Sequence, residues 1–222
     1  MAKDALIIFS RLPVGRETKT RLSPILSKEQ RSELHLAMWR DLFPEAQKLN
    51  GTADVFLYWT GSGDITDYRQ IVPESFILRE QRGENLGVKM SNAMREILAS
   101  GYGKAILIGS DIPSLRAVNL QRAFRLLDDV PVVLGPSADG GYWLIGMSEF
   151  VPEAFSVKSW GHSDVLTATT QTLNSLGIRY KFADTLQDMD TPEDVRDFML
   201  KRPDYHSEVY KFLSLNVPVN RK

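Results

Sequence analysis

Asp111 has the sequence position best suited to metal chemistry. It lies just beyond an apolar run, residues 104–109, and Pro113 stops that segment from continuing. Ligands of open α/β sheets bind beyond the carboxyl ends of strands, where Mg²⁺ commonly takes one or two carboxylates with substrate phosphates and waters. Asp188 and Asp190 precede a helix start far along the chain, and a second carboxylate facing Asp111 would complete a minimal magnesium site. The alternative is that Asp111 caps a helix or makes a turn.

The loop after the first expected strand carries a cluster of cations. Residues 11–21 include one acid and four basic side chains: Arg11, Arg16, Lys19 and Arg21. Gly15 lets the backbone turn and approach a ligand closely. Guanidinium forks and an ammonium group suit phosphate oxygens, so we expect a polyphosphate cradle. A solvated basic loop is the alternative.

Other segments suit the acceptor side of such a site. Asp139 lies in a Gly-rich link between two apolar strands and is a candidate general base, but a hairpin turn would also explain it. Tyr142 offers a flat surface for a base or sugar ring, or packs as an ordinary strand residue. Trp160 and His162 stand at an expected helix entrance and are candidates for an acceptor pocket, with a structural role as the alternative.

Two weaker signals complete the set. Gly87 lies near an expected helix start at residues 83–90, where free backbone N–H groups can take an anion or a base edge; a loop punctuated by glycine is the alternative. His35 and His206 fall in segments expected to be helical, and we expect them to be surface or partner contacts. No histidine pair has the spacing of a zinc site.

Short β-branched runs that alternate with amphipathic segments must position these residues. We expect strands at residues 5–9, 53–59, 75–79, 104–109, 131–134, 142–145 and 178–182. We expect helices at residues 27–48, 64–72, 85–99, 118–127 and 162–176, and a last long helix that Thr191 and Pro192 open and Pro203 breaks. This order predicts an α/β fold: one domain over residues 1–222, with three α/β/α layers around a mostly parallel sheet. Its core would span about residues 5–200, followed by a C-terminal helix and tail.

Composition narrows the function classes. The 222 residues carry a net charge of −1, which gives no global attraction to nucleic acid or anionic membrane, and no cysteine, which excludes disulfides and thiolate chemistry. No uncharged apolar stretch approaches the ~20 residues of a membrane span, and the start lacks a signal-peptide pattern. We expect a cytoplasmic protein. The first loop also lacks the dinucleotide and Walker A glycine spacings. The sequence gives no indication of oligomeric state.

The motifs recur together in a known order. Arg11-x-Pro13, Gly15, Lys19-x-Arg21-Leu22, Gly109-Ser110-Asp111-x-Pro113, Gly135-Pro136, Asp139-Gly140-Gly141-Tyr142, Trp160 and Asp188-x-Asp190-Thr191-Pro192-Glu193-Asp194 resemble the nucleotide-diphospho-sugar transferase superfamily of GT-A fold. Within it the chain is most similar to the glycosyltransferase-like DUF2064 group, which is related to phospholactate and molybdenum-cofactor guanylyltransferases. The resemblance spans residues 5 to about 200.

The resemblance implies site residues. Arg11, Gly15, Lys19 and Arg21 would bind the nucleotide phosphates, and Gly87 would lie near the base. Asp111 would be a metal ligand in contact with the nucleotide, and Asp190 the second ligand of Mg²⁺ or Mn²⁺. Lys19, Arg21 and Asp111 would be the catalytic residues. Asp139 matches no known role. The chain departs from relatives in lacking the repeated glycines of the first loop and the Asp-x-Asp of most glycosyltransferases.

Three functions follow as hypotheses. The first is metal-dependent nucleotidyl transfer from an NTP to a small phosphorylated acceptor. The second is glycosyl transfer from an NDP-sugar, for which Asp139 or His162 would serve as general base. The third is a nucleotide-sensing module without catalysis. The basic first loop favours a triphosphate donor.

Overall fold

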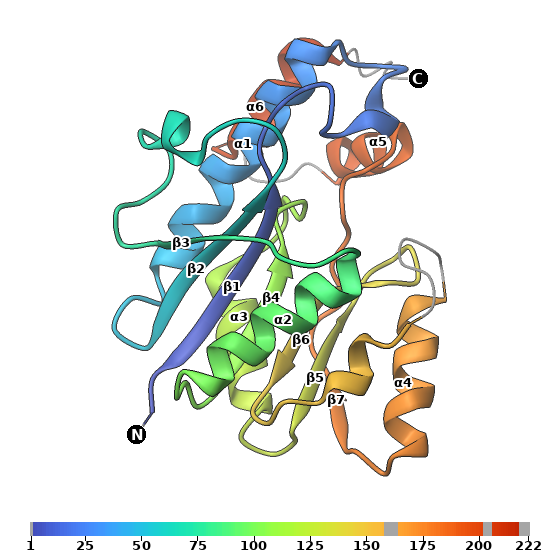
Figure 1. Ribbon diagram of the computed structural model, residues 1–222. Coiled ribbons are helices and arrows are strands. Elements are labelled where there is room, and N and C mark those ends of the chain that lie inside the picture. Colours follow the sequence, from blue (N-terminus) through green and yellow to red (C-terminus); the bar gives the residue numbers. More distant parts are fainter. Residues whose placement is uncertain (1, 158–163, 202–205, 218–222) are drawn as a thin grey trace.

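The computed structural model describes residues 2–157, 164–201 and 206–217. Within them, one seven-stranded sheet has the order β3-β2-β1-β4-β6-β5-β7. Strand β6 runs antiparallel to β4 and β5, and the other pairs are parallel. The predicted α/β fold with a mostly parallel sheet is confirmed (Figure 1).

The predicted strands are all present, with ends shifted by up to two residues. Their bounds are β1 Asp4–Arg11, β2 Ala53–Thr60, β3 Ile77–Glu80, β4 Ala105–Gly109, β5 Val132–Pro136, β6 Tyr142–Met147 and β7 Tyr180–Phe182. Runs such as the six buried residues inside β1 form strands because both faces of a parallel sheet are covered.

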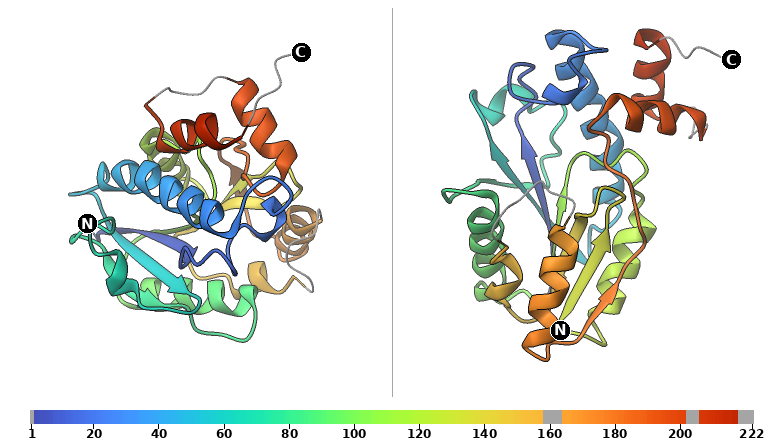
Figure 2. Two further views of the ribbon diagram at one scale, coloured as in Figure 1. Left: turned by 90° about the horizontal axis from the view of Figure 1, so that it is seen from above. Right: turned by 90° about the vertical axis from the view of Figure 1, so that its right-hand side faces the viewer.

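Helices cover both faces of the sheet (Figure 2). Helices α1 (Lys28–Gln47) and α3 (Ala117–Leu126) pack on one face, where Leu6, Ile8 and Leu57 belong to the same core cluster as Trp39 of α1. Helices α2 (Leu86–Ala99) and α4 (Val165–Ser175) pack on the other, together with the short 3-10 helix Pro152–Phe155. Two further 3-10 turns are Thr20–Leu22 and Ile65–Tyr68, so the short helix expected at residues 64–72 is a single tight turn.

Two helices form the end of the described chain. The predicted Thr191 cap and Pro192 start are present in α5 (Pro192–Leu200), and α6 (Glu208–Asn216) falls within the C-terminal helix and tail expected after about residue 200. The Asp41 carboxylate accepts hydrogen bonds from Ser207 Oγ and from the backbone N–H of Glu208 and Val209, so it holds the start of α6 against α1. His206 is exposed in a turn rather than in a helix. Pro203 and residues 218–222 of the expected tail lie outside the described residues.

Helices α1, α5 and α6 enclose a third core cluster away from the sheet. Leu22 and Leu26, which follow the basic loop, pack there beside Met189, Val195 and other apolar residues. The cluster therefore joins the basic loop to the segment that leads into α5. None of the described helices has the length and apolar character needed to cross a membrane.

Candidate active site

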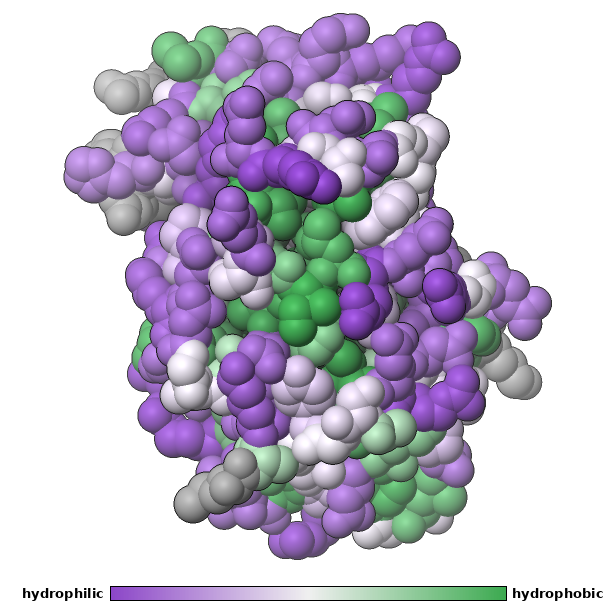
Figure 3. Space-filling model, turned by 60° about the vertical axis from the view of Figure 1, so that its left-hand side comes forward, coloured by the Kyte–Doolittle hydropathy of each residue, from purple (hydrophilic) through white to green (hydrophobic). Residues whose placement is uncertain are grey.

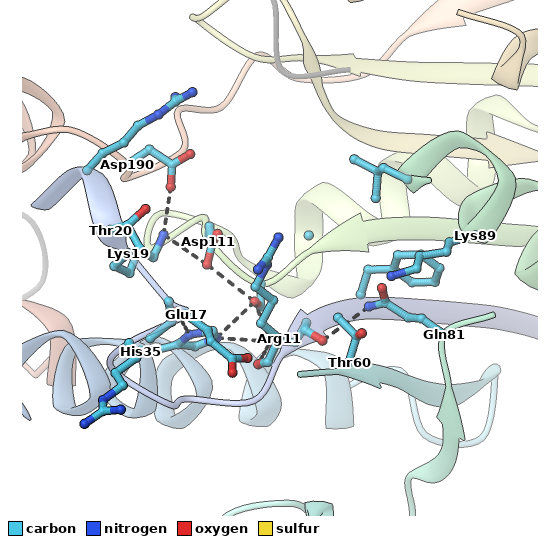
Figure 4. Close-up of a pocket in the computed structure, with 18 residues that line it drawn as sticks. Arg11, Glu17, Lys19, Thr20, His35, Thr60, Gln81, Lys89, Asp111 and Asp190 are labelled. Atoms are coloured by element: carbon cyan, nitrogen blue, oxygen red, sulfur yellow. Dashed lines mark hydrogen bonds and ion pairs between the residues drawn. The ribbon is translucent and has the colours of Figure 1, made fainter. Parts of the chain in front are cut away.

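A cleft of about 780 Å³ opens where the sheet order reverses, beyond the carboxyl ends of β1 and β4 (Figure 4). Ligands of open α/β sheets bind at this kind of position, and the volume is in the range of small-molecule sites. Five cationic side chains line it: Arg11, Arg16, Lys19, Arg21 and Lys89. Asp111 and Asp190 lie among them. The face of the molecule seen in Figure 3 has apolar side chains in a hollow between hydrophilic ones.

Lys19 joins the two predicted metal ligands. Its Nζ lies 3.0 Å from Asp111 Oδ1 and 3.1 Å from Asp190 Oδ1, and it donates a third hydrogen bond, of 2.7 Å, to the Met189 carbonyl. The Lys19 side chain is 1% exposed, while the two carboxylates are 39% and 44% exposed. The acids expected to converge on one cation therefore do converge, on an ammonium group of the protein itself.

Lys19 has a raised pKa and an unusual backbone conformation. Burial acts to lower the pKa of Lys19, but Asp111 and Asp190 outweigh it and raise the pKa. Burial likewise opposes ionisation of Asp111, but the Lys19 ammonium lowers the pKa of this carboxyl. Lys19 has φ 50° and ψ 39°, in the left-handed region, which costs on the order of 1 kcal/mol for a residue other than glycine. The three acceptors of its ammonium hold it in this conformation.

Helix α1 holds the basic loop in place through hydrogen bonds from Arg31. Arg31 is buried, and its guanidinium donates to the carbonyls of Gly15 (2.8 Å) and Thr20 (3.4 Å). A Cβ on Gly15 would lie 2.0 Å from the carbonyl oxygen of Lys28. Gly15 is outside the lining of the cleft, so its small size serves the packing of the loop on α1 in place of the expected close approach to a ligand.

His35 corrects one expectation. It was expected at the surface, but it is 2% exposed and lines the cleft, with its ring nitrogens next to Thr18 Oγ1 and Ser10 Oγ. Position 35 lies on the helix stripe of Leu34, Met38 and Leu42, all buried. That periodicity is the sequence signal that could have placed His35 inside.

Asp190 reaches the cleft because Met189 anchors its segment. The Met189 N–H donates to the Asp111 carbonyl at 2.9 Å, and its side chain is buried in the third core cluster. Asp188 lies on the other side of Met189, and the sequence alone assigned this acid no role of its own. Burial, reinforced by the charges of Asp111, Asp190 and Asp139, raises the pKa of Asp188 to about 7.

Asp139 lies in the hairpin between β5 and β6. Its Oδ1 accepts from Ser137 Oγ (2.6 Å) and from the Gly141 N–H (3.0 Å), so it makes the turn that was considered as the alternative to catalysis. It also lines a second cavity of about 190 Å³, which shares Arg21 and Asp190 with the main cleft.

The remaining candidates do not gather at the cleft. Tyr142 is packed against the core under α4 and lines neither cavity. Gly87 is buried in the first turn of α2, while its neighbours Leu86 and Lys89 line the cleft. Trp160 and His162 lie outside the described residues. Gln81 was not singled out in the sequence, but it lines the cleft and donates to the carbonyls of Ser10 and Tyr58.

The family model described as "Uncharacterized protein conserved in bacteria (DUF2064)" matches residues 45–162. The chain belongs to this family. The matched residues include β4 and Asp111, whereas Lys19 and Asp190 lie outside them. The family predicted from the motifs is confirmed.

Two guanylyltransferases and one solved structure are similar to this DUF2064 protein. The 2-phospho-L-lactate guanylyltransferase of Methanobrevibacter smithii is 30% identical over 60% of this chain and 58% of its own length. The enzyme of the same name from Methanocaldococcus jannaschii is 26% identical over 92% and 86%. A Desulfovibrio desulfuricans G20 protein, named provisionally as a nucleotide-diphospho-sugar transferase, has a TM-score of 0.89 and 25% identity over 97% and 96%. The predicted transferase class agrees with these names.

Proposed function

We propose that this protein transfers a nucleotidyl group from an NTP to a small phosphorylated acceptor. The observation that carries the proposal is the cleft itself, where two carboxylates are held against the Lys19 ammonium and four further cationic side chains of the described residues line the walls. Such a charge arrangement suits a triphosphate with a divalent cation. GTP is the donor we favour, because both curated relatives are named guanylyltransferases.

The cationic side chains have different roles in the proposed reaction. Arg11, Arg16 and Arg21 are exposed and make no ion pair within the described residues, so their guanidinium groups are available to phosphate oxygens. Lys19 has already donated all three ammonium protons to protein acceptors. It contributes through its charge and by holding Asp111 and Asp190 together, while the arginines stabilise the departing pyrophosphate.

The donor set fits Mg²⁺ or Mn²⁺. Asp111 and Asp190 offer hard oxygen ligands, of which the Oδ1 atoms contact Lys19, and two carboxylates with substrate phosphates are a common magnesium environment. Among the described residues, no group of three or more His, Cys, Asp or Glu side chains is arranged to hold a metal ion. In the proposal, substrate phosphates and waters complete the coordination. A bound divalent cation would neutralise phosphate charge and polarise the α-phosphate.

The smaller cavity is suited to the acceptor. Arg21 and Asp190 belong to both cavities, so a phosphate held there would lie beside the donor phosphates. An acceptor phosphate oxygen forms a bond to the α-phosphorus as the bond from that phosphorus to the pyrophosphate oxygen breaks. The attacking oxygen is already anionic, so no general base is required, and alignment of the reactants supplies much of the rate.

Glycosyl transfer from an NDP-sugar is the second candidate. It is favoured by the name of the Desulfovibrio protein, whose chain matches this one over nearly its full length. That reaction needs a base when configuration inverts, and Asp139, the candidate base, lines the second cavity together with Asp188, Asp190 and Asp194.

Product analysis separates the candidates. The protein is incubated with Mg²⁺ and each NTP or NDP-sugar, together with a panel of small organophosphates that includes 2-phospho-L-lactate. Acceptor-dependent release of pyrophosphate supports nucleotidyl transfer, and release of free NDP supports glycosyl transfer. Tight nucleotide binding without turnover of any acceptor in a broad panel would instead indicate a nucleotide sensor.

A further inference from the structure

His35 sits in a chain of buried hydrogen bonds that the proposed function does not use. The imidazole contacts the Thr18 hydroxyl through Nδ1 and the Ser10 hydroxyl, at 3.0 Å, through Nε2. Ser10 Oγ lies 2.8 Å from Ser110 Oγ, which lies 3.4 Å from Asp111 Oδ1. This chain links the basic loop to the metal-binding carboxylate through side chains from α1, β1 and the end of β4.

The protons of this chain can be assigned by counting donors. Neutral imidazole has one N–H and one bare nitrogen. If the N–H were on Nδ1, it would donate to Thr18 Oγ1, and the Thr18 proton would have no acceptor among the described residues. Thr18 is 3% exposed, and an unpaired buried hydroxyl costs about 1–3 kcal/mol. The proton is therefore on Nε2, and the Thr18 hydroxyl donates to Nδ1.

The direction of the remaining bonds follows from Ser10. Its oxygen accepts from His35 Nε2–H and from Trp39 Nε1–H, the latter at 2.9 Å, and these two bonds use both lone pairs. Two hydroxyl oxygens 2.8 Å apart need a proton between them, so Ser10 donates to Ser110. The Arg11 carbonyl, 2.9 Å from Ser10 Oγ, is left as the weaker competitor for that proton. Ser110 then donates to Asp111.

The environment of His35 keeps it neutral. Burial lowers its pKa to about 4, an effect that Asp111 partly opposes and Lys19 adds to. A neutral ring has the single donor and single acceptor that the chain needs. The same stretch of α1 supplies Trp39, whose N–H reaches Ser10 but stands outside the path from Thr18 to Asp111.

We infer that His35 is a positioning residue, whose Nε2–H tautomer transmits the position of Thr18 in the basic loop to the Asp111 carboxylate through Ser10 and Ser110. Thr18 neighbours Lys19, so the loop acts on Asp111 by two routes: the direct ion pair and this hydrogen-bond chain. The functional part of the inference rests on the proposed metal site at Asp111, whereas the tautomer does not.

The tautomer is measured first. Long-range ¹H–¹⁵N correlation spectra of the ¹⁵N-labelled protein at pH 7, without nucleotide, should show His35 with protonated Nε2 and bare Nδ1. In Thr18→Val, which keeps the side-chain shape but removes the hydroxyl, the ring should shift towards a mixture of tautomers; Thr18→Ser should restore the single Nε2–H form. A protonated Nδ1 in the unsubstituted protein overturns the inference, whatever the enzyme's activity.

The link to Asp111 is tested by Mn²⁺ titration with and without GTP, followed by electron paramagnetic resonance. Thr18→Val should raise the apparent Kd for Mn²⁺ about fivefold, equivalent to the loss of one hydrogen bond of about 1 kcal/mol, and Thr18→Ser should return it to within about twofold. Leu42→Val is the matched control: it removes a methylene group from the buried side of α1 and lowers stability, but Leu42 makes no hydrogen bond to this chain, so Mn²⁺ affinity should be unchanged.

Three outcomes are informative. Equal Mn²⁺ affinity in Thr18→Val and the unsubstituted protein means that His35 does not position Asp111. An equal loss in Leu42→Val means that the effect is general destabilisation, which also overturns the inference. If the unsubstituted protein binds no Mn²⁺ at all, the proposed metal site fails and the positioning role fails with it, while the tautomer spectra still decide whether the hydrogen-bond chain exists.

Discussion

The two aspartates that follow buried strands have different surroundings. Asp111 lies beyond β4, a central parallel strand, and its carboxylate meets the Lys19 ammonium in the main cleft. Asp139 follows β5 in a hairpin, and its carboxylate is used by its own turn. Both are acidic residues near glycines and apolar strands, so the position in the sheet distinguishes them. A parallel strand must end in a crossover that leaves its carboxyl end open, whereas a hairpin closes on itself.

The largest expected effect tests this contrast directly. Asp111→Asn should lower turnover by about 10²–10³-fold, because it removes charge needed to hold a divalent cation at the reacting phosphates. Asp139→Asn should change it by less than about threefold, since an amide can still accept the two turn hydrogen bonds. Steady-state kinetics of the two variants are compared after circular dichroism confirms their folds. Equal losses would place the hairpin in the catalytic site.

Removal of the Lys19 ammonium group, which bridges Asp111 and Asp190, should have the next largest effect. Lys19→Met leaves two carboxylates facing each other, and we expect stability to fall by about 2 kcal/mol, less than for a fully buried pair because both acids are partly exposed. Urea unfolding with EDTA and with excess Mn²⁺ provides the measurement. The loss should shrink with Mn²⁺, which can replace the missing positive charge. The same loss in both conditions would contradict a shared cation site.

Substitutions of two arginines can distinguish the donor site in the main cleft from the acceptor site in the smaller cavity. Arg21 lines both, whereas Arg16 lines only the main cleft. Arg21→Ala should raise KM for both NTP and acceptor by about tenfold, the effect of losing one charge-assisted hydrogen bond. Arg16→Ala should raise KM for the NTP alone. If Arg21→Ala leaves the acceptor KM unchanged, the smaller cavity is not the acceptor site.

The smallest effect concerns Asp188. Its folded pKa of about 7 lies above the ordinary aspartate value, so its contribution to stability is present below about pH 4 and is lost as the pH rises through 7. Asp188→Asn should therefore raise the free energy of unfolding by about 1–2 kcal/mol at pH 8 and by less at pH 5. Urea titrations at both pH values in EDTA measure this. A gain that does not depend on pH would argue against the raised pKa.

Local sequence signals predicted the fold well. The helix starts expected at Ser27 and Thr191 are present, each with a capping box, because such a box depends on residues three positions apart. Alternating apolar runs also located every strand. A C-terminal helix was expected after about residue 200, but its attachment to α1 through Asp41, 166 positions from Ser207, depends on the tertiary fold.

The site was predictable only where chemistry and topology coincided. Asp111 and Asp190 could be proposed because both stand at the ends of recognisable elements. His35 was misplaced because its polar character suggested the surface, while its contacts with Ser10, Thr18 and Ser110 depend on the tertiary fold. Lys19 was expected to face phosphate, but the observed position of its ammonium depends on an acid 171 positions away.

The third core cluster supports two segments that line the cleft from opposite ends of the chain. Leu22 and Met189 both rest in it, one just after the basic loop and the other between two acids of the site. Helix α6 packs in the same cluster and therefore stabilises both of these segments. Substitutions on its buried side, such as Val209→Ala or Leu213→Ala, should loosen both segments together, although neither residue lines the cleft.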